Sequence, residues 1–347
     1  MTTIYDIAKA AGVSPTTVSR VLNNYPDVSA KTKEKITKTM KELDYIPSTS
    51  ARSLSTKRSY LIGVLFDESL NVGIKHPYFA GVIEGFKTEL AIHGYDTMFI
   101  VNKLGNKQIG YLQHCKIRGV DGVCFFANDE DDENIKELVN SDIKSVTTDL
   151  SHEKVPRICS DNEEGSRLVM EHYFKNNHEH IGVVMGPLHT KASVERLEGV
   201  KKIYRTYQKD FDEHYVVVAE DYHIQGGYEA AKKLFESVDE SNQPTAIYAG
   251  SDILAVGVLK YLREINKQIP DDVELIGFDN IELTSLISPT LSTIAQDRSE
   301  IGKVAAQVLI KMIENPEITI KNKVTRIPVE LILRDSTKNF NGNGMKE

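Results

Sequence analysis

Length, composition and charge already exclude several classes of protein. The chain has 347 residues, 40% of them hydrophobic, which suffices for two or three domains with buried cores, and no apolar run reaches the roughly 20 residues of a membrane helix. The net charge of −8 is divided unevenly: residues 1–58 hold ten Lys and Arg against five Asp and Glu, a net of +5, and the remainder carries −13. A basic head on an acidic body predicts that contact with nucleic acid is local to the N-terminus.

The N-terminus and the cysteines indicate a cytoplasmic protein. The first residues, MTTIYDIAK, open directly into a helical pattern and lack the features of an export signal. Cys115, Cys124 and Cys159 form neither a CxxC pair nor a disulfide framework. We therefore expect buried, reduced thiols.

The first 22 residues predict two short helices joined by a tight turn. The buried face of the first helix is formed by Ile4, Ile7, Ala8 and Ala11, and that of the second by Val18, Val21 and Leu22. Between them, Gly12 is the turn residue that ends the first helix. Ser14 is placed to cap the second helix, and Pro15 takes the first position of that helix, where a missing N–H is tolerated. This is the pattern of a helix-turn-helix, although two surface helices of any α-helical domain share it.

The start of the second helix carries the residues expected to read DNA. Thr16, Thr17 and Arg20 lie on its outward face, the part that enters the major groove in this motif. Arg20 can donate two hydrogen bonds to guanine, and threonine offers a hydroxyl and a methyl group.

A third helix is expected from Ser29 to Leu43. Its buried stripe would be Ile36, Met40 and Leu43, with lysines around the remainder. Lysines on a helix usually form a solvated face, so we expect only one or two of them to contact phosphate.

These segments resemble the lactose/galactose repressor (LacI/GalR) family of transcription regulators. The resemblance rests on IYDIAKAAGVSPTTVSRVLN, VSAKTKEKI and LDYIPSTSARSLSTKRSYLIGV. It implies a hinge at residues 48–56 that becomes helical on DNA, with Leu54 as an apolar wedge in the minor groove and Ser50 and Ala51 also at the DNA. Ordinary interdomain packing is the alternative role for Leu54. Because two hinges act together, the resemblance implies a homodimer on palindromic double-stranded DNA.

Beyond residue 58, short β-rich runs alternate with amphipathic stretches, which predicts parallel α/β sheets. The candidate strands form two series: Leu61–Phe66, Thr97–Val101, Gly122–Phe126 and Lys144–Thr148, then His180–Met185, Tyr215–Ala219, Ala246–Ala249 and Glu274–Phe278. Two series indicate two doubly wound subdomains, whose facing crevices would form a ligand cleft.

The resemblance extends to about Ser336 and implies a periplasmic-binding-protein-like body behind the all-α head. The chain would cross between subdomains near Asp161, Thr293 and Arg326. We expect the following division: a helix-turn-helix domain at 1–47, a hinge at 48–58, a ligand-binding and dimerisation domain at 59–337, and a disordered tail at 338–347. Within the body, the first subdomain would take about 59–161 and 293–325, and the second about 162–292 and 326–337.

Polar and aromatic residues recur after the predicted strands, where an α/β crevice places its ligand-facing groups. They are Tyr78, Phe79, Asp149, Arg196, Tyr222 and Asp279. Carboxylates and a guanidinium bind sugar hydroxyls in pairs, and aromatic rings cover the apolar face of a sugar. Taken singly, such an aromatic residue also suits a core, and such an aspartate suits a helix cap.

The resemblance supports this set motif by motif. HPYF resembles the aromatic element at the cleft entrance, RLEGV and IGFDN match the motifs of Arg196 and Asp279, and IAQDR adds Gln296. Asp149 resembles a hydroxyl-binding carboxylate, and Tyr222 stands where the family has a stacking aromatic residue.

Two departures from the family concern the ligand. GPLHTKASVERL resembles the purine repressor branch, yet Thr190 and Ala192 stand where that branch has an arginine and a threonine. This argues against a purine ligand. Ser251 replaces an asparagine of many sugar-responsive relatives, which leaves the hydroxyl pattern open.

The predicted function is a DNA-binding repressor without a cofactor, released from its operator when a sugar or sugar phosphate closes the cleft. A repressor strengthened by its ligand, or dependent on a partner, is the alternative. A free-standing sugar-binding receptor would not need the basic head. An enzyme is not expected, because GxSxG, P-loop and HExxH motifs are missing. The pair His178 and His180 is expected to lie in a solvated loop and not to hold a metal.

Overall fold

The computed structural model describes residues 2–22, 25–45, 58–66, 74–126, 132–150, 152–318, 320 and 323–338. The chain forms two compact units, residues 1–60 with 119–121 and the remainder, and each unit is considered by itself. The hinge residues Ser50, Ala51 and Leu54, and the predicted tail beyond Lys338, lie outside the described residues. No described helix is long and apolar enough to cross a membrane.

The described part of the N-terminal unit contains three helices: α1 (Ile4–Ala11), α2 (Pro15–Leu22) and α3 (Ala30–Glu42). Thr3 and Asp6 form a reciprocal capping box at the start of α1, and Gly12 ends it at a φ of 59°, which favours glycine. The Ser14 hydroxyl accepts from the Thr17 N–H at 3.1 Å and begins α2. The buried core of the unit comprises Ile7, Ala8, Ala11, Val18, Val21 and Ile36. The predicted helix-turn-helix is confirmed.

The third helix buries less than the sequence predicted. Ile36 is fully buried and Met40 packs partly against the core, but Leu43 is 38% exposed. Leu43 is the C-cap of α3, so the helical periodicity that would turn it inward has already ended there.

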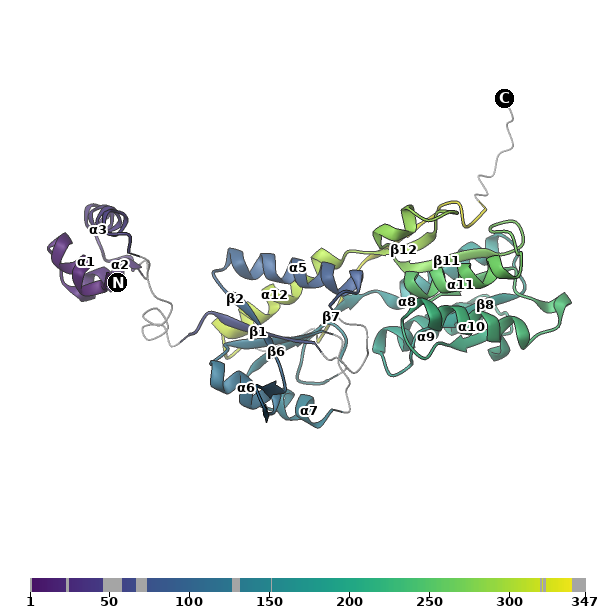
Figure 1. Ribbon diagram of the computed structural model, residues 1–347, viewed down its shortest axis with the longest axis horizontal. Helices are drawn as coiled ribbons and strands as arrows, with labels where there is room; N and C mark the ends of the chain where they lie inside the picture. The colour runs from purple at the N-terminus through teal and green to yellow at the C-terminus, as the bar shows by residue number, and fades with distance from the viewer. Residues whose placement is uncertain are drawn as a thin grey trace, which may run out of the picture. The chain divides into compact units, whose positions relative to one another are not determined.

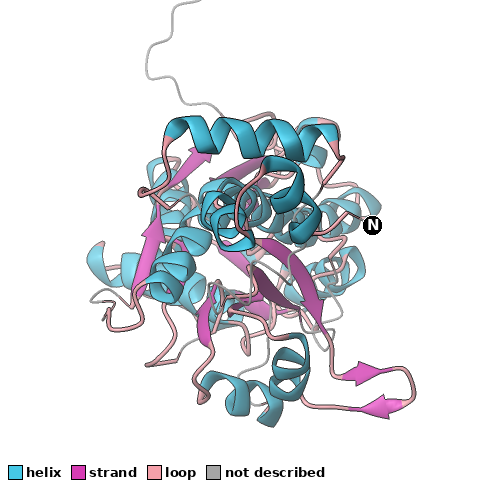
Figure 2. Ribbon diagram, turned by 90° about the vertical axis from the view of Figure 1, so that its left-hand side faces the viewer, coloured by secondary structure: helices cyan, strands magenta, loops and turns pink. Residues whose placement is uncertain are grey.

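Within the described residues, the body is built on two six-stranded sheets. The first has the order β2 (Asp96–Ile100), β1 (Leu61–Phe66), β5 (Gly122–Phe126), β6 (Lys144–Thr147), β7 (Arg157–Ser160) and β13 (Val324–Ile327). The second has the order β9 (Val216–Val218), β8 (Ile181–Met185), β10 (Ala246–Ala249), β11 (Glu274–Asp279), β12 (Ser292–Gln296) and β14 (Val329–Ile332). Apart from the antiparallel β14, the strands of both sheets pair in parallel, which confirms the predicted doubly wound body. A hairpin of β3 (Lys103–Leu104) and β4 (Lys107–Gln108) projects from it (Figure 2).

Helices cover both faces of each sheet (Figure 1). On the first sheet, α5 (Pro77–Ile92) and α12 (Arg298–Glu314) lie opposite α6 (Tyr111–Arg118) and α7 (Glu133–Val139). On the second, α8 (Asn162–Lys175) and α9 (Lys191–Thr206) share a core with Val183 and Tyr248, whereas α10 (Ile224–Glu236) and α11 (Asp252–Glu264) share one with Val184 and Ile247. The contact of α5 with α12 requires glycine, because a Cβ at Gly302 would overlap the Val82 carbonyl. Short 3-10 turns occupy Glu213–Tyr215, Glu240–Asn242 and Glu282–Ser285.

The chain crosses between the two sheets three times. It leaves the first sheet after Ser160, returns to it after Gln296, and crosses again between β13 and β14. The second crossing lies beyond the predicted Thr293 because β12 pairs with β11 and β14 of the second sheet. The third lies beyond the predicted Arg326 because β13 pairs with β7 through Ile327. The strand pairing therefore places the second and third crossings a few residues after Thr293 and Arg326.

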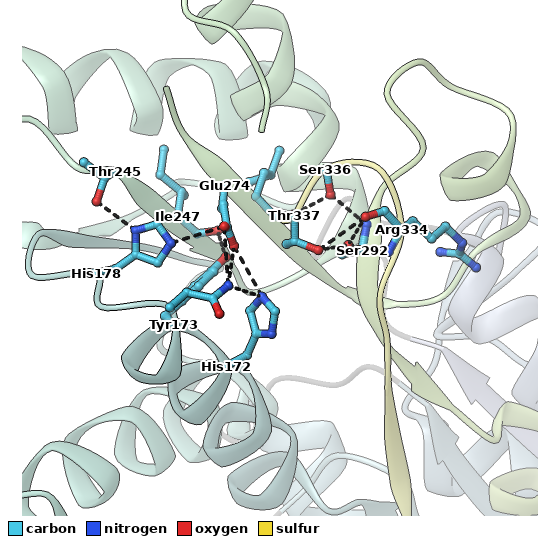
Figure 3. A network of polar contacts seen from close by, with 12 residues as sticks. His172, Tyr173, His178, Thr245, Ile247, Glu274, Ser292, Arg334, Ser336 and Thr337 are labelled. Carbon is cyan, nitrogen blue, oxygen red and sulfur yellow. Dashed lines mark hydrogen bonds and ion pairs between the residues drawn. The ribbon is translucent and has the colours of Figure 1, made fainter. Parts of the chain in front are cut away.

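A buried carboxylate, that of Glu274, lies at the start of β11 in the second sheet (Figure 3). Glu274 is 1% exposed, and its oxygens lie 3.3 Å from His172 Nε2 and 3.4 Å from His178 Nε2. Burial alone would raise the pKa of Glu274, but the neighbouring His172 and His178 lower it, to about 2. His178 lies in the loop between α8 and β8, but its side chain is only 12% exposed and is not solvated as predicted, because the buried carboxylate needs polar partners. Among the described residues, no cluster of three or more His, Cys, Asp or Glu could hold a metal.

Candidate functional site: the cleft between the subdomains

A cavity lies between the two subdomains of the body, at the carboxyl ends of their strands. The space that no atom fills, its opening included, is about 680 Å³. All seven residues predicted to bind the ligand line it: Tyr78, Phe79, Asp149, Arg196, Tyr222, Asp279 and Gln296. The structure thus brings the predicted set together, as two facing crevices require. Their roles toward a ligand stay predictions.

Arg196 is held rigidly at the second-subdomain wall of the cleft. It lies on α9 and is 5% exposed. Its Nε donates to Asn162 Oδ1 at 2.9 Å, and Nη1 donates to the Gly250 carbonyl. Its guanidinium carbon lies 3.6 Å from the centroid of the Phe278 ring. Two hydrogen bonds and a ring contact therefore orient the guanidinium group of Arg196. Its other N–H groups remain for a ligand.

Asp279 and Gln296 connect the second subdomain to the first. Gln296 Nε2 donates to Asp279 Oδ1 at 2.6 Å, and the Ser160 hydroxyl at the end of β7 donates to Gln296 Oε1. Asp279 is 3% exposed with a φ of 125°, which is strained for a residue with a side chain. Burial raises its pKa; nearby Arg196 opposes this rise and the Asp252 carboxylate adds to it. The arrangement places a buried carboxyl group at the cleft, where it can pair with ligand hydroxyls.

Aromatic rings form the apolar part of the lining. Tyr78 and Phe79 begin α5, and the Phe79 ring packs edge-on against Phe66 with centroids 5.1 Å apart. The Tyr222 hydroxyl lies 2.6 Å from Thr190 Oγ1 and 2.7 Å from Ser193 Oγ. These bonds hold the Tyr222 ring in place, so it offers a fixed face to a ligand.

The sequence reasoning missed several residues of the lining. They are Thr148, Arg157, Cys159, Ser160 and Asn162. Three of them belong to β7, a four-residue strand that begins with an arginine and has no clear hydrophobic pattern. The expected crossing near Asp161 could have identified these residues, because residues that precede a crossing between subdomains lie at the cleft.

The predicted DNA-reading face belongs to the N-terminal unit. Thr16 and Arg20 are exposed, whereas the half-buried Thr17 has its hydroxyl 2.8 Å from Ser14 Oγ. The Arg20 guanidinium pairs with Asp27, and its carbon lies 5.4 Å from the Tyr25 ring centroid. Arg20 must exchange these exposed partners for a base or phosphate in order to contact DNA.

Comparison with known proteins gives a family match within each of the two units. The family described as bacterial regulatory proteins, lacI family, matches residues 3–48, and the periplasmic binding protein-like domain matches residues 170–337. The chain is 31% identical over 344 residues to the HTH-type transcriptional repressor PurR of Aliivibrio fischeri (strain MJ11), covering 98% of this chain and 99% of the relative. It is 33% identical over 342 residues to the ribose operon repressor of Halalkalibacterium halodurans, covering 97% and 98%. The lac repressor dimer bound to operator and the anti-inducer ONPF has a TM-score of 0.76 at 26% identity, covering 97% of this chain and 99% of that one.

A helix-turn-helix head and a two-lobed body, with a cleft lined by polar and aromatic side chains, define a ligand-controlled DNA-binding regulator. The chain belongs to the lacI family of bacterial regulatory proteins. The resemblance found in the sequence is confirmed.

Proposed function

We propose that this regulator is a transcriptional repressor that binds a palindromic operator as a homodimer and is released when a sugar or sugar phosphate occupies the cleft. The observation that carries the proposal is the cleft itself, where carboxylates, a guanidinium and aromatic rings face one space. This combination binds paired hydroxyls and covers the apolar face of a sugar ring.

The lining favours a sugar over a purine base. The Thr190 hydroxyl donates to the Pro187 carbonyl at 2.9 Å and lies within bonding distance of Tyr222, and Ala192 has no polar side-chain atom. Neither Thr190 nor Ala192 therefore offers a donor with which a base edge would be read, although relatives named for purine repression also match the chain. The ribose operon repressor among the relatives supports the sugar.

Ligand binding is coupled to DNA binding through a shift in the relative arrangement of the two subdomains. A ligand that contacts both walls stabilises one arrangement by as much as its affinity differs between them. In a homodimer this arrangement would decide whether both heads and hinges engage the operator. The second candidate function is a repressor whose ligand strengthens DNA binding. It would use the same cleft, subdomains and DNA-binding head. We place the repressor in the cytoplasm, with the chromosome, and assign it neither enzymatic activity nor a cofactor.

The test is fluorescence anisotropy of the full chain on a palindromic operator with a central CG step. Sugars, sugar phosphates and purine bases are titrated in turn. Release by a sugar or sugar phosphate supports the proposal, and tightening by a sugar supports the second candidate. A response to purines alone overturns the effector class. Arg196→Glu is expected to abolish the response, and a retained response would show that the assignment of Arg196 is wrong.

A further inference from the structure

We propose that His76 and Thr148 determine ligand specificity by each contacting one oxygen of the bound sugar from the first subdomain. Both residues line the cleft. Each has a buried polar atom, His76 Nε2 and Thr148 Oγ1, without a hydrogen-bond partner in the described part of the chain. The inference rests on the proposed function, because it needs a sugar in the cleft.

The His76 ring is fixed as a hydrogen-bond donor. His76 is the N-cap of α5, and its Nδ1 accepts from the Tyr78 backbone N–H at 3.3 Å. Burial and the positive charge of nearby Arg196 lower the pKa of His76 to about 4, so the ring is neutral at pH 7. With Nδ1 used as an acceptor, the single ring proton lies on Nε2. The ligand atom that meets Nε2 must therefore be an acceptor, as a sugar oxygen is.

The Thr148 hydroxyl does not hold the turn that follows β6. Its neighbour Thr147 holds this turn, because Thr147 Oγ1 accepts from the N–H groups of Asp149 at 3.1 Å and Leu150 at 3.0 Å. Thr148 itself is 5% exposed, so its hydroxyl is removed from bulk water. A hydroxyl can donate and accept, and a ligand hydroxyl satisfies either requirement.

The two atoms contact different positions on the ligand. His76 lies beyond the carboxyl end of β1 and Thr148 beyond that of β6, and β5 separates these strands in the sheet. Neighbouring strands are about 4.8 Å apart, so the ends of β1 and β6, which the two residues follow in the chain, are about two strand spacings apart. A site with buried polar groups rejects an analogue that leaves one unpaired. The cleft should therefore discriminate against deoxy sugars at two positions.

The experiment uses isothermal titration calorimetry of the full chain with D-ribose, D-glucose, D-galactose and their monodeoxy analogues. Thr148→Val is expected to weaken binding of the preferred sugar by about tenfold or more. This loss should disappear with the one monodeoxy analogue that lacks the hydroxyl read by Thr148. Thr147→Val is the matched control: it should lower the thermal midpoint, since three hydrogen bonds are lost, and any loss of affinity that it causes should be the same for the sugar and for each monodeoxy analogue.

His76 is tested with two replacements. His76→Asn retains a side-chain acceptor for the Tyr78 N–H, whereas His76→Ala removes both functions. Both are expected to weaken sugar binding equally, and only His76→Ala should lower the thermal midpoint. Wild-type affinity in both Thr148→Val and His76→Asn would overturn the inference and leave the proposed function standing. The inference also fails if Thr148→Val lowers the midpoint as much as Thr147→Val, because the hydroxyl is then structural. If no sugar binds the wild-type chain, the sugar proposal and the inference fall together.

Discussion

Arg157 and Glu195 form a buried ion pair across the wall of the cleft. Arg157 begins β7 in the first subdomain and Glu195 lies on α9 in the second, and their side chains are 6% and 10% exposed. The other carboxylate oxygen of Glu195 accepts from Asn162 Nδ2 at 2.9 Å. Because its two ends belong to different subdomains, the pair favours the arrangement in which they meet.

Breaking this pair from one side is expected to be strongly destabilising. Arg157→Met leaves the Glu195 carboxylate buried with Asn162 as its remaining partner in the described part of the chain, and should lower the free energy of unfolding by about 3 kcal/mol or more. The double change Arg157→Met with Glu195→Leu removes the unpaired charge and should recover most of that loss. Urea unfolding of the single and double variants measures both effects. A double variant no more stable than Arg157→Met would contradict the prediction.

Arg20 and Asp27 allow a test of the DNA-reading face. Arg20→Ala should weaken operator binding by about 1–3 kcal/mol if Arg20 contacts a base. Asp27→Asn releases Arg20 from an exposed ion pair, which is worth little, so operator affinity should rise by no more than about fivefold. Fluorescence anisotropy at one fixed salt concentration, with operator and scrambled DNA, measures both. An equal loss on both DNAs for Arg20→Ala would assign Arg20 to phosphate contact.

Asp279 predicts how stability changes with pH. Because burial raises its folded pKa above the unfolded value of about 4, the folded chain holds the extra proton between these two values. The free energy of unfolding should therefore fall as the pH rises from about 4 toward the folded pKa. Asp279→Asn should remove this contribution, so its stability relative to wild type should grow with pH. Urea unfolding at several pH values tests this. The opposite trend would show that Arg196 stabilises Asp279 as an anion.

The lowered pKa of Glu274 predicts the reverse trend at acidic pH, where the free energy of unfolding should fall as the pH falls. Its folded pKa of about 2 lies below the usual value, so its stabilisation is present above about pH 4.5 and is lost as the pH falls toward 2. Glu274→Gln should lower stability at pH 7 and flatten the loss across this range. Glu220→Gln, which changes an exposed carboxylate, is the control and should leave the acid profile unchanged. Thermal unfolding between pH 2 and 7 supplies the measurement, and a Glu274→Gln profile as steep as the wild-type one would contradict it.

Much of the fold follows from local sequence signals. Gly12, Ser14 and Pro15 define the turn of the helix-turn-helix because their own backbone preferences and capping act within a few residues. The long apolar strands, such as Gly122–Phe126, were recognisable because parallel strands covered on both faces read as continuous hydrophobic runs. The short β7 and the edge strand β14 carry no such run, and tertiary pairing alone makes them strands.

The candidate site divides in the same way. The sequence by itself determined which motifs supply Arg196, Asp279 and Gln296, because RLEGV, IGFDN and IAQDR resemble motifs of the family and residues that follow α/β strands face the crevice. Only the tertiary structure decided which polar atoms within the cleft are satisfied by the protein and which are left for a ligand. The hydroxyls of Thr147 and Thr148 are adjacent in the chain, yet one is bonded within its turn and the other is not. Burial and hydrogen bonding depend on neighbours distant in sequence, and so the assignment of His76 and Thr148 required the folded chain.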